Sequence, residues 1–78
     1  MFVEVRLYAT LRRYVSDSSR GVVSVEVPED YTVAQLLSTM HIDLAEVHII
    51  MINGVSNIPS SILHEGDRLG LFPAVGGG

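Results

Sequence analysis

The segment from Thr32 to Met40 constrains this chain most, because it predicts one short amphipathic helix. Thr32 and Gln35 form the pattern of a capping box, in which each side chain satisfies a free backbone N–H group of the first turn. An apolar stripe follows along one face of the helix, made of Val33, Leu36, Leu37 and Met40. A helix of about ten residues is not stable alone in water, so we expect this stripe to pack on a β-sheet.

Two segments before the helix alternate apolar and polar residues, which is typical of half-buried strands. The first covers residues 2–8. The second covers residues 22–27 and ends before Pro28, which cannot donate a hydrogen bond to a neighbouring strand. Between them, residues 10–15 have the spacing of a short helix or turn, and residues 16–21 form a polar loop.

Three further strands are predicted after the helix. Residues 48–52 are apolar and β-branched, and the Asn53-Gly54 pair after them favours a tight hairpin, because both positions tolerate positive φ. Residues 55–58 are the return strand, and residues 68–72 are the last strand, expected beside the first. This order predicts an α+β fold, the β-grasp or ubiquitin-like fold, with a mixed sheet of four or five strands and one main helix across one face.

The 78 residues fit one domain, which we divide into a β-grasp domain at residues 1–73 and a flexible C-terminal glycine tail at residues 74–78. A domain of this size leaves no room for an enclosed substrate pocket, so we expect no catalytic site of its own. No apolar run approaches the ~20 residues that span a membrane. The N-terminus also lacks the pattern of a signal peptide, so the expected location is the cytoplasm.

Composition excludes several kinds of chemistry. The chain has neither cysteine nor lysine, which excludes thiol nucleophiles, thiolate metal ligands and Schiff bases. Its three histidines, His41, His48 and His64, share no helical turn, so we read them as ordinary surface residues and expect no metal site. The net charge of −4 disfavours binding to nucleic acid. The charge is uneven, because residues 1–20 carry four arginines against two carboxylates, whereas residues 21–78 carry one arginine against seven.

The C-terminal glycines follow directly on the last strand. Such a terminus is ordinarily only frayed. Here Phe72 and Pro73 stiffen the exit from the strand, and a glycine backbone without side chains can thread a narrow channel. The five residues 74–78 reach at most about 17 Å, enough to enter the active site of a partner. What this tail offers chemically is one unhindered carboxylate, at Gly78.

The ending Phe72-Pro73-Ala74-Val75-Gly76-Gly77-Gly78 resembles the FPPVxGG ending of the MoaD/ThiS family of ubiquitin-like sulfur carriers. The Asn53-Gly54 pair and the Glu65-Gly66-Asp67 turn also match the pattern of that family. The segment 8–12 is similar to the small subunit of molybdopterin synthase, and the similarity covers essentially the whole chain. This sequence departs from the family pattern at Ala74, which replaces a proline, and at Gly76, which adds a third glycine.

The resemblance implies that Gly78 is the reacting residue and that Gly77 leads it into the channel. A partner adenylating enzyme, of the ubiquitin-activating kind, would use ATP to convert the Gly78 carboxylate into an acyl-adenylate. Sulfur would then replace AMP and give a thiocarboxylate, the sulfur donor in molybdopterin (molybdenum cofactor) biosynthesis. There the tail would insert into the large catalytic subunit of molybdopterin synthase. The chain itself would bind no cofactor.

The alternation of the first strand predicts the face that meets these partners. If Val3, Val5 and Leu7 face the helix, the residues between them face out, together with apolar residues of the later strands. Large apolar side chains on the open face of a small domain indicate a docking patch. The predicted partner-binding residues are Phe2, Arg6, Met51, Phe72, Pro73, Val75 and Gly76. The opposite strand parity would place the apolar ones in the core.

Three alternatives stay open. The chain could carry sulfur for thiamin or for a tungsten cofactor. It could be a protein modifier, in which the activated Gly78 is joined to lysines of target proteins. It could also be a non-catalytic β-grasp binding module, for which the glycine tail would not matter.

Overall fold

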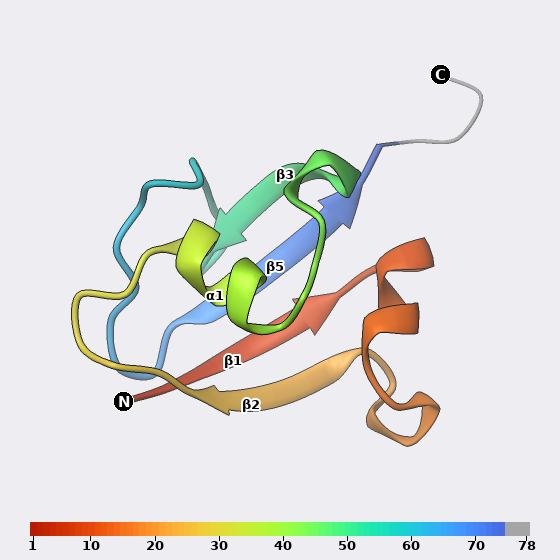
Figure 1. The fold of residues 1–78 in the computed structure, drawn as a ribbon, viewed down its shortest axis with the longest axis horizontal. Coiled ribbons are helices and arrows are strands. Elements are labelled where there is room, and N and C mark those ends of the chain that lie inside the picture. Colours follow the sequence, from red (N-terminus) through yellow and green to blue (C-terminus); the bar gives the residue numbers. More distant parts are fainter. Residues whose placement is uncertain (75–78) are drawn as a thin grey trace.

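A five-stranded mixed sheet with one α-helix across one face forms the body of the protein (Figure 1). The computed structural model describes residues 1–74, so the predicted tail lies outside the described residues from residue 75 onward. The strands are β1 (Phe2–Leu7), β2 (Val22–Glu26), β3 (Val47–Ile52), β4 (Val55–Asn57) and β5 (Arg68–Pro73). The α-helix is α1 (Val33–Thr39), and three short 3₁₀ helices are η1 (Ala9–Tyr14), η2 (Asp17–Ser19) and η3 (Leu44–Glu46).

The strand order is β2-β1-β5-β3-β4, which places the last strand in the middle of the sheet. β1 pairs antiparallel with β2 and parallel with β5, as expected for a crossover through α1. β3 pairs antiparallel with both β5 and β4. This mixed topology confirms the predicted β-grasp fold.

The core lies between the sheet and α1. The strand parity predicted for β1 is confirmed, because Val3, Val5 and Leu7 are fully buried against the helix side. Leu69 and Leu71 of β5 alternate in the same way and are also fully buried. The remaining buried residues are Leu11, Val27, Val33, Leu36, Leu37, Ile42, Ile50 and Leu63.

The start of α1 has the predicted capping box. The Thr32 hydroxyl accepts a hydrogen bond from the Gln35 N–H at 3.2 Å, and the Gln35 side-chain oxygen accepts one from the Thr32 N–H at 2.8 Å. Met40, the last residue of the predicted stripe, is half-buried against the core. The helix is therefore held at its first turn by its cap and along its length by its apolar stripe.

A hydrogen-bond network around the buried carboxylate of Asp67 fixes the start of β5. Asn53 and Gly54 have φ values of 52° and 81°, which confirms the predicted two-residue hairpin between β3 and β4. The Asn53 side chain donates to Asp67 Oδ1 at 2.9 Å and accepts from the Arg68 N–H at 2.9 Å. Asp67, which is only 8% exposed, also accepts from the His64 N–H at 2.8 Å. The turn before β5 is thus tied to the β3–β4 hairpin.

The connections at the other end of the sheet are 3₁₀ helices. The segment predicted as a short helix or turn at residues 10–15 is η1, which follows β1 directly. η2 continues the same connection toward β2, whereas η3, which precedes β3, was not predicted from the sequence. No helix within residues 1–74 is both long and apolar enough to cross a membrane.

Candidate functional site

The uncovered face of the sheet carries a stacked aromatic pair. Tyr8 follows β1 and Phe72 lies near the end of β5, and their rings stack with centroids 4.2 Å apart and planes 4° from parallel. Gly70 leaves room beneath them, because a Cβ atom built there would lie 3.4 Å from the Phe72 ring and 3.6 Å from the Tyr8 ring. The two rings and the missing side chain together make a flat apolar platform beside a depression.

This depression is a groove of about 290 Å³ that crosses the uncovered face. We call it the arginine–aromatic groove, and its lining residues are Arg6, Tyr8, Met51, Asn53, Gly54, Arg68, Gly70 and Phe72. They come from β1, from β5 and from the β3–β4 hairpin, which the strand order brings side by side. The groove therefore joins an apolar half to a basic half.

Glu4 organises the basic half of this groove. Its carboxylate accepts a hydrogen bond from Arg6 Nε at 2.7 Å, and this bond raises the pKa of the Arg6 guanidinium. Glu4 also lies opposite Arg68 in the parallel register of β1 and β5. Arg6 is thus paired with a carboxylate on the uncovered face of the sheet, where both side chains stay partly open to solvent.

A second, more apolar hollow lies where β5 ends. It has a volume of about 450 Å³, and we call it the exit hollow. Its lining residues are Tyr8, Ala9, Thr10, His48, Ile49, Phe72, Pro73 and Ala74. The pairing of β3 with β5 is irregular between Val47 and Ile49, which leaves Ile49 44% exposed at the rim. Pro73 and Ala74, which lead into the predicted tail, form part of its lining, so this hollow lies beside the root of the tail.

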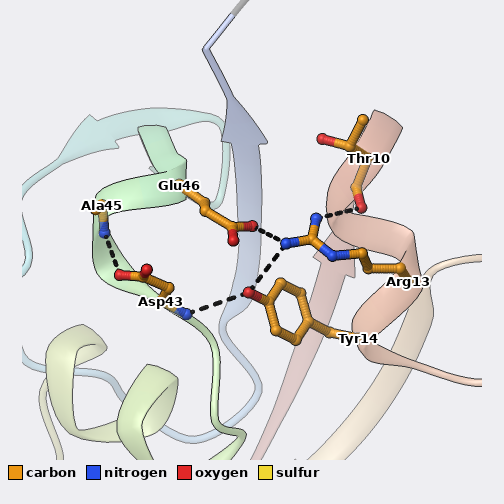
Figure 2. Close-up of polar contacts among 6 residues, drawn as sticks. All are labelled: Thr10, Arg13, Tyr14, Asp43, Ala45 and Glu46. Carbon is orange, nitrogen blue, oxygen red and sulfur yellow. Dashed lines mark hydrogen bonds and ion pairs between the residues drawn. The ribbon is translucent and has the colours of Figure 1, made fainter.

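An ion-pair cluster braces the two sides of this exit (Figure 2). Arg13 of η1 donates to the Glu46 carboxylate of η3 and to the Tyr14 hydroxyl, and it also donates to the Thr10 carbonyl at 3.0 Å. The hydrogen bond that Arg13 donates to the Glu46 carboxylate raises the pKa of the Arg13 guanidinium. The Asp43 N–H reaches the same Tyr14 hydroxyl at 3.5 Å. Figure 2 shows β5 passing between η1 and η3, so the cluster holds these two elements on either side of the strand.

The predicted partner-binding residues fall into three groups. Arg6, Met51 and Phe72 line one groove, and Pro73 joins Phe72 at the exit hollow. Phe2 is on the same face and 52% exposed, but it lies at the opposite end of β1, where its N–H donates to Glu65 at 3.0 Å. The predicted site residues of the tail, Val75, Gly76, Gly77 and Gly78, lie outside the described residues.

Arg68 and Tyr8 are groove residues that the predicted partner-binding set does not contain. The alternation of β5 carries a signal for Arg68, because Arg68, Gly70 and Phe72 alternate with the two buried leucines, Leu69 and Leu71. The register that brings Arg68 beside Glu4 has no signature in the sequence. Within residues 1–74, no three histidine or carboxylate side chains gather in a way that could hold a metal ion.

Comparison with known proteins places the chain among ubiquitin-like proteins. The sequence model of a family described as Mut7-C ubiquitin matches residues 1–76. A search of curated proteins finds no match. Among solved structures, SAMP1 from Haloferax volcanii is similar with a TM-score of 0.74 at 24% identity, with all of both chains covered.

Two further structures are similar. One is that of small archaeal modifier protein 1 from H. volcanii, with a TM-score of 0.70, 23% identity, and coverage of 95% of this chain and 98% of that one. The other is the complex of subunits 1 and 2 of molybdopterin-converting factor from Helicobacter pylori, where one chain gives a TM-score of 0.63 at 20% identity, with full coverage of both. At such identities the likeness shows a shared fold.

Proposed function

Because the chain belongs to the Mut7-C ubiquitin family, we propose that it is a ubiquitin-like sulfur carrier whose Gly78 carboxylate is activated by a partner enzyme. The predicted resemblance to the ubiquitin-like MoaD/ThiS family is confirmed at the level of family and fold. The observation that carries the proposal is the exit of β5. There, a docking face with two hollows surrounds the root of a sequence that continues as Val75-Gly76-Gly77-Gly78.

The proposed reaction has two steps. An oxygen of the Gly78 carboxylate attacks the α-phosphorus of ATP on the partner, and pyrophosphate leaves. Sulfide, delivered by a sulfur donor, then attacks the activated carbonyl carbon, and AMP leaves with the bonding electrons. The ionised carboxylate is a poor electrophile, so the adenylate supplies the leaving group that the chain lacks. The product is a thiocarboxylate on Gly78.

The role of the domain is to position the tail, whereas the partner enzyme supplies the chemistry. Rigid placement of the tail root matters, because a reacting carbonyl must lie within about 3–3.5 Å of the attacking atom. Two features supply this placement, namely the pairing of Pro73 with Val47 and the ion-pair cluster that holds η1 and η3 beside β5. The aromatic platform of Tyr8 and Phe72 offers the partner an apolar anchor next to the tail.

For the second partner we propose the large catalytic subunit of a molybdopterin synthase. The support is the similarity to a chain in the complex of subunits 1 and 2 of molybdopterin-converting factor. In that role the thiocarboxylate enters the active site of the large subunit and gives up its sulfur to a pterin precursor. The apolar exit hollow would then lie against the mouth of that site.

The test is the intact mass of the chain after incubation with a candidate adenylating enzyme, ATP and a sulfide source. The native protein is weighed first, since the proposal requires Gly78 to carry the free carboxylate. Replacement of one carboxylate oxygen by sulfur adds about 16 Da, the difference between the atomic masses of the two elements. We expect this increase only when ATP is present.

Two matched variants complete this test. One lacks Gly78 and the other carries one additional alanine, which moves the carboxylate by about 3.3–3.6 Å. We expect neither to be adenylated, while their melting temperatures match that of the unaltered chain, because the buried core is made of residues between Val3 and Leu71. A thiocarboxylate that forms at the normal rate on the extended chain contradicts the proposal, and full function of both variants favours a plain binding module.

A protein modifier is the second candidate, favoured by the similarity to small archaeal modifier protein 1. It shares the adenylation step, but the acyl group passes to a lysine of a target protein instead of to sulfide. The chain has no lysine, so its own side chains cannot receive such a bond. Mass spectrometry of target peptides separates the two candidates, because only the modifier leaves Gly78 joined to a lysine side chain.

A further inference from the structure

The connection between β1 and β2 carries two arginines without an ionic partner. It contains Arg12, Arg13 and Arg20 against the single carboxylate of Asp17. Arg13 is neutralised by Glu46, as described above. Within residues 1–74, neither Arg12 nor Arg20 has a carboxylate oxygen within ion-pair distance. Two guanidinium groups are therefore free to bind an anion.

These two arginines share one hollow of about 280 Å³, which we call the loop pocket. Its lining residues are Arg12, Ser16, Asp17, Arg20 and Gly21. Gly21 has a φ of 81°, and a Cβ atom built on it would lie 2.5 Å from the Leu7 carbonyl oxygen and 3.1 Å from Arg12 Cγ. Only glycine fits, and its missing side chain lets the Arg12 stem lie directly against the backbone of the turn.

The other side of the loop pocket is held by backbone hydrogen bonds. Arg20 adopts a left-handed conformation with a φ of 55°, and its N–H donates to the Asp17 carbonyl at 3.1 Å. The next N–H, of Gly21, donates to the Ser19 hydroxyl at 3.3 Å. Both arginines therefore leave from a backbone whose conformation is fixed, so little chain entropy is lost when they bind.

The loop pocket lies at the same end of the sheet as the root of the tail. Leu7, the last residue of β1, donates its N–H to the Gly21 carbonyl at 2.7 Å, and Tyr8 donates to the Leu71 carbonyl at 3.2 Å. Only four residues follow Ala74, and they span at most about 14 Å. A partner that reacts with Gly78 must therefore cover this end of the domain.

The net charge of the loop pocket matches the charge of a single carboxylate. Arg12 and Arg20 carry two positive charges and Asp17 carries one negative charge, which leaves a net charge of one positive unit. One carboxylate would neutralise this charge, and both guanidinium groups can donate to it. At the opposite end of the domain, Glu29, Asp30 and Glu65 line an acidic depression beside Met1, so Arg12 and Arg20 lie at the end where the tail leaves and away from these carboxylates.

We propose that the loop pocket binds a carboxylate side chain on the rim of the adenylating enzyme's channel and thereby aligns the tail with that channel. This inference rests on the proposed function. It names the chemistry of the partner surface, an acidic residue at the rim of the channel that receives the tail. The contact is electrostatic and lies outside the channel, so it affects encounter and docking rather than the chemical step.

The experiment measures adenylation kinetics with the adenylating enzyme as a function of chain concentration and of salt. The test variant is the double substitution Arg12→Gln and Arg20→Gln. The matched control is Arg13→Gln, which removes the same kind of charge from the same connection but from an arginine already paired with Glu46. We expect the double variant to raise KM about tenfold with kcat unchanged, and to lose most of the salt dependence of KM.

Each outcome decides the inference. A KM for the double variant equal to that of the control overturns it and leaves the proposed function standing. If the unaltered chain is not adenylated, the proposed function fails. The carboxylate pocket is then tested separately by titrating the isolated chain with hexaglutamate. The NMR signals of the arginine Nε–H groups report the binding. Shifts confined to Arg12 and Arg20 then support the carboxylate pocket, and their absence overturns it.

Discussion

The two ends of β5 differ in how far they are open to a partner. At its start, the Arg68 N–H is bound by Asn53, and the preceding Asp67 is buried with each of its carboxylate oxygens accepting a hydrogen bond. At its end, Pro73 pairs only with Val47 across an irregular register, and an apolar hollow opens beside it. We therefore call the start of β5, at Arg68, the closed end and the other end, at Pro73, the open end.

This difference shows how a domain without an enclosed pocket divides its work. At the closed end, the side chains of Asn53 and Asp67 are engaged in hydrogen bonds within the chain, and only the basic half of the arginine–aromatic groove reaches it. The open end leaves two arginines and an aromatic pair exposed to solvent beside the root of the tail. Hydrogen bonds that stabilise the fold thus concentrate at one end of β5, and the contact surfaces beside the tail lie at the other. Substitutions can therefore change one without the other.

The largest expected effect is the loss of the whole fold, and with it of both ends of β5. Leu36→Asp places a carboxylate in the fully buried interface between α1 and the sheet, where it has no partner. An unpaired buried charge costs several kcal/mol, against a total stability of about 4–12 kcal/mol for a chain of this size. We expect thermal denaturation to show no folded state. Ser38→Asp, on the exposed side of the same helix, should melt cooperatively.

A smaller loss of stability is expected from a substitution that loosens only the start of β5. Asp67→Ala removes the acceptor of the Asn53 amide and of the His64 N–H, and because both hydrogen bonds are only partly buried, the loss of each costs about 0.5–1.5 kcal/mol. Urea denaturation should show this loss of stability, while the KM for adenylation stays unchanged under conditions where the variant is folded. Glu65→Ala, in the same turn but exposed, is the matched control. A large rise in KM for Asp67→Ala would mean that the two ends are coupled.

The smallest effect should appear at the open end. Phe72→Ala removes half of the aromatic platform and should weaken binding to the adenylating enzyme by about 1 kcal/mol, as for a buried interface aromatic. Phe2→Ala is the control, because it removes the same ring from the same face at the other end of β1. Calorimetric titration measures both. Equal losses of affinity in the two variants would show that the docking surface extends along the whole of β1, as the sequence alone predicted.

The sequence predicted most of the fold because its signals are local. Alternation identified β1, the capping box placed the start of α1, and the Asn53-Gly54 pair fixed the β3–β4 hairpin. Each of these signals lies within a few neighbouring residues, so no knowledge of the tertiary structure was needed.

The groove and the loop pocket depend instead on register and on loop conformation. Arg6 and Arg68 share a groove only because β1 and β5 pair with one particular offset. Arg12 and Arg20 share a pocket because of a left-handed turn that ends at Gly21. The asymmetry of charge was visible in the sequence, but the pairing of Arg13 with Glu46, which leaves the other two arginines free, spans 33 positions.

The parallel pairing of β1 with β5 also has a mechanical consequence. A pull applied between the start of β1 and the end of β5 runs along both strands in opposite directions, because they lie side by side with the same polarity. Such a load shears all the bonds of the ladder at once instead of opening them one after another. A force applied between the N-terminus and the tail is therefore resisted by the hydrogen bonds between β1 and β5 acting together.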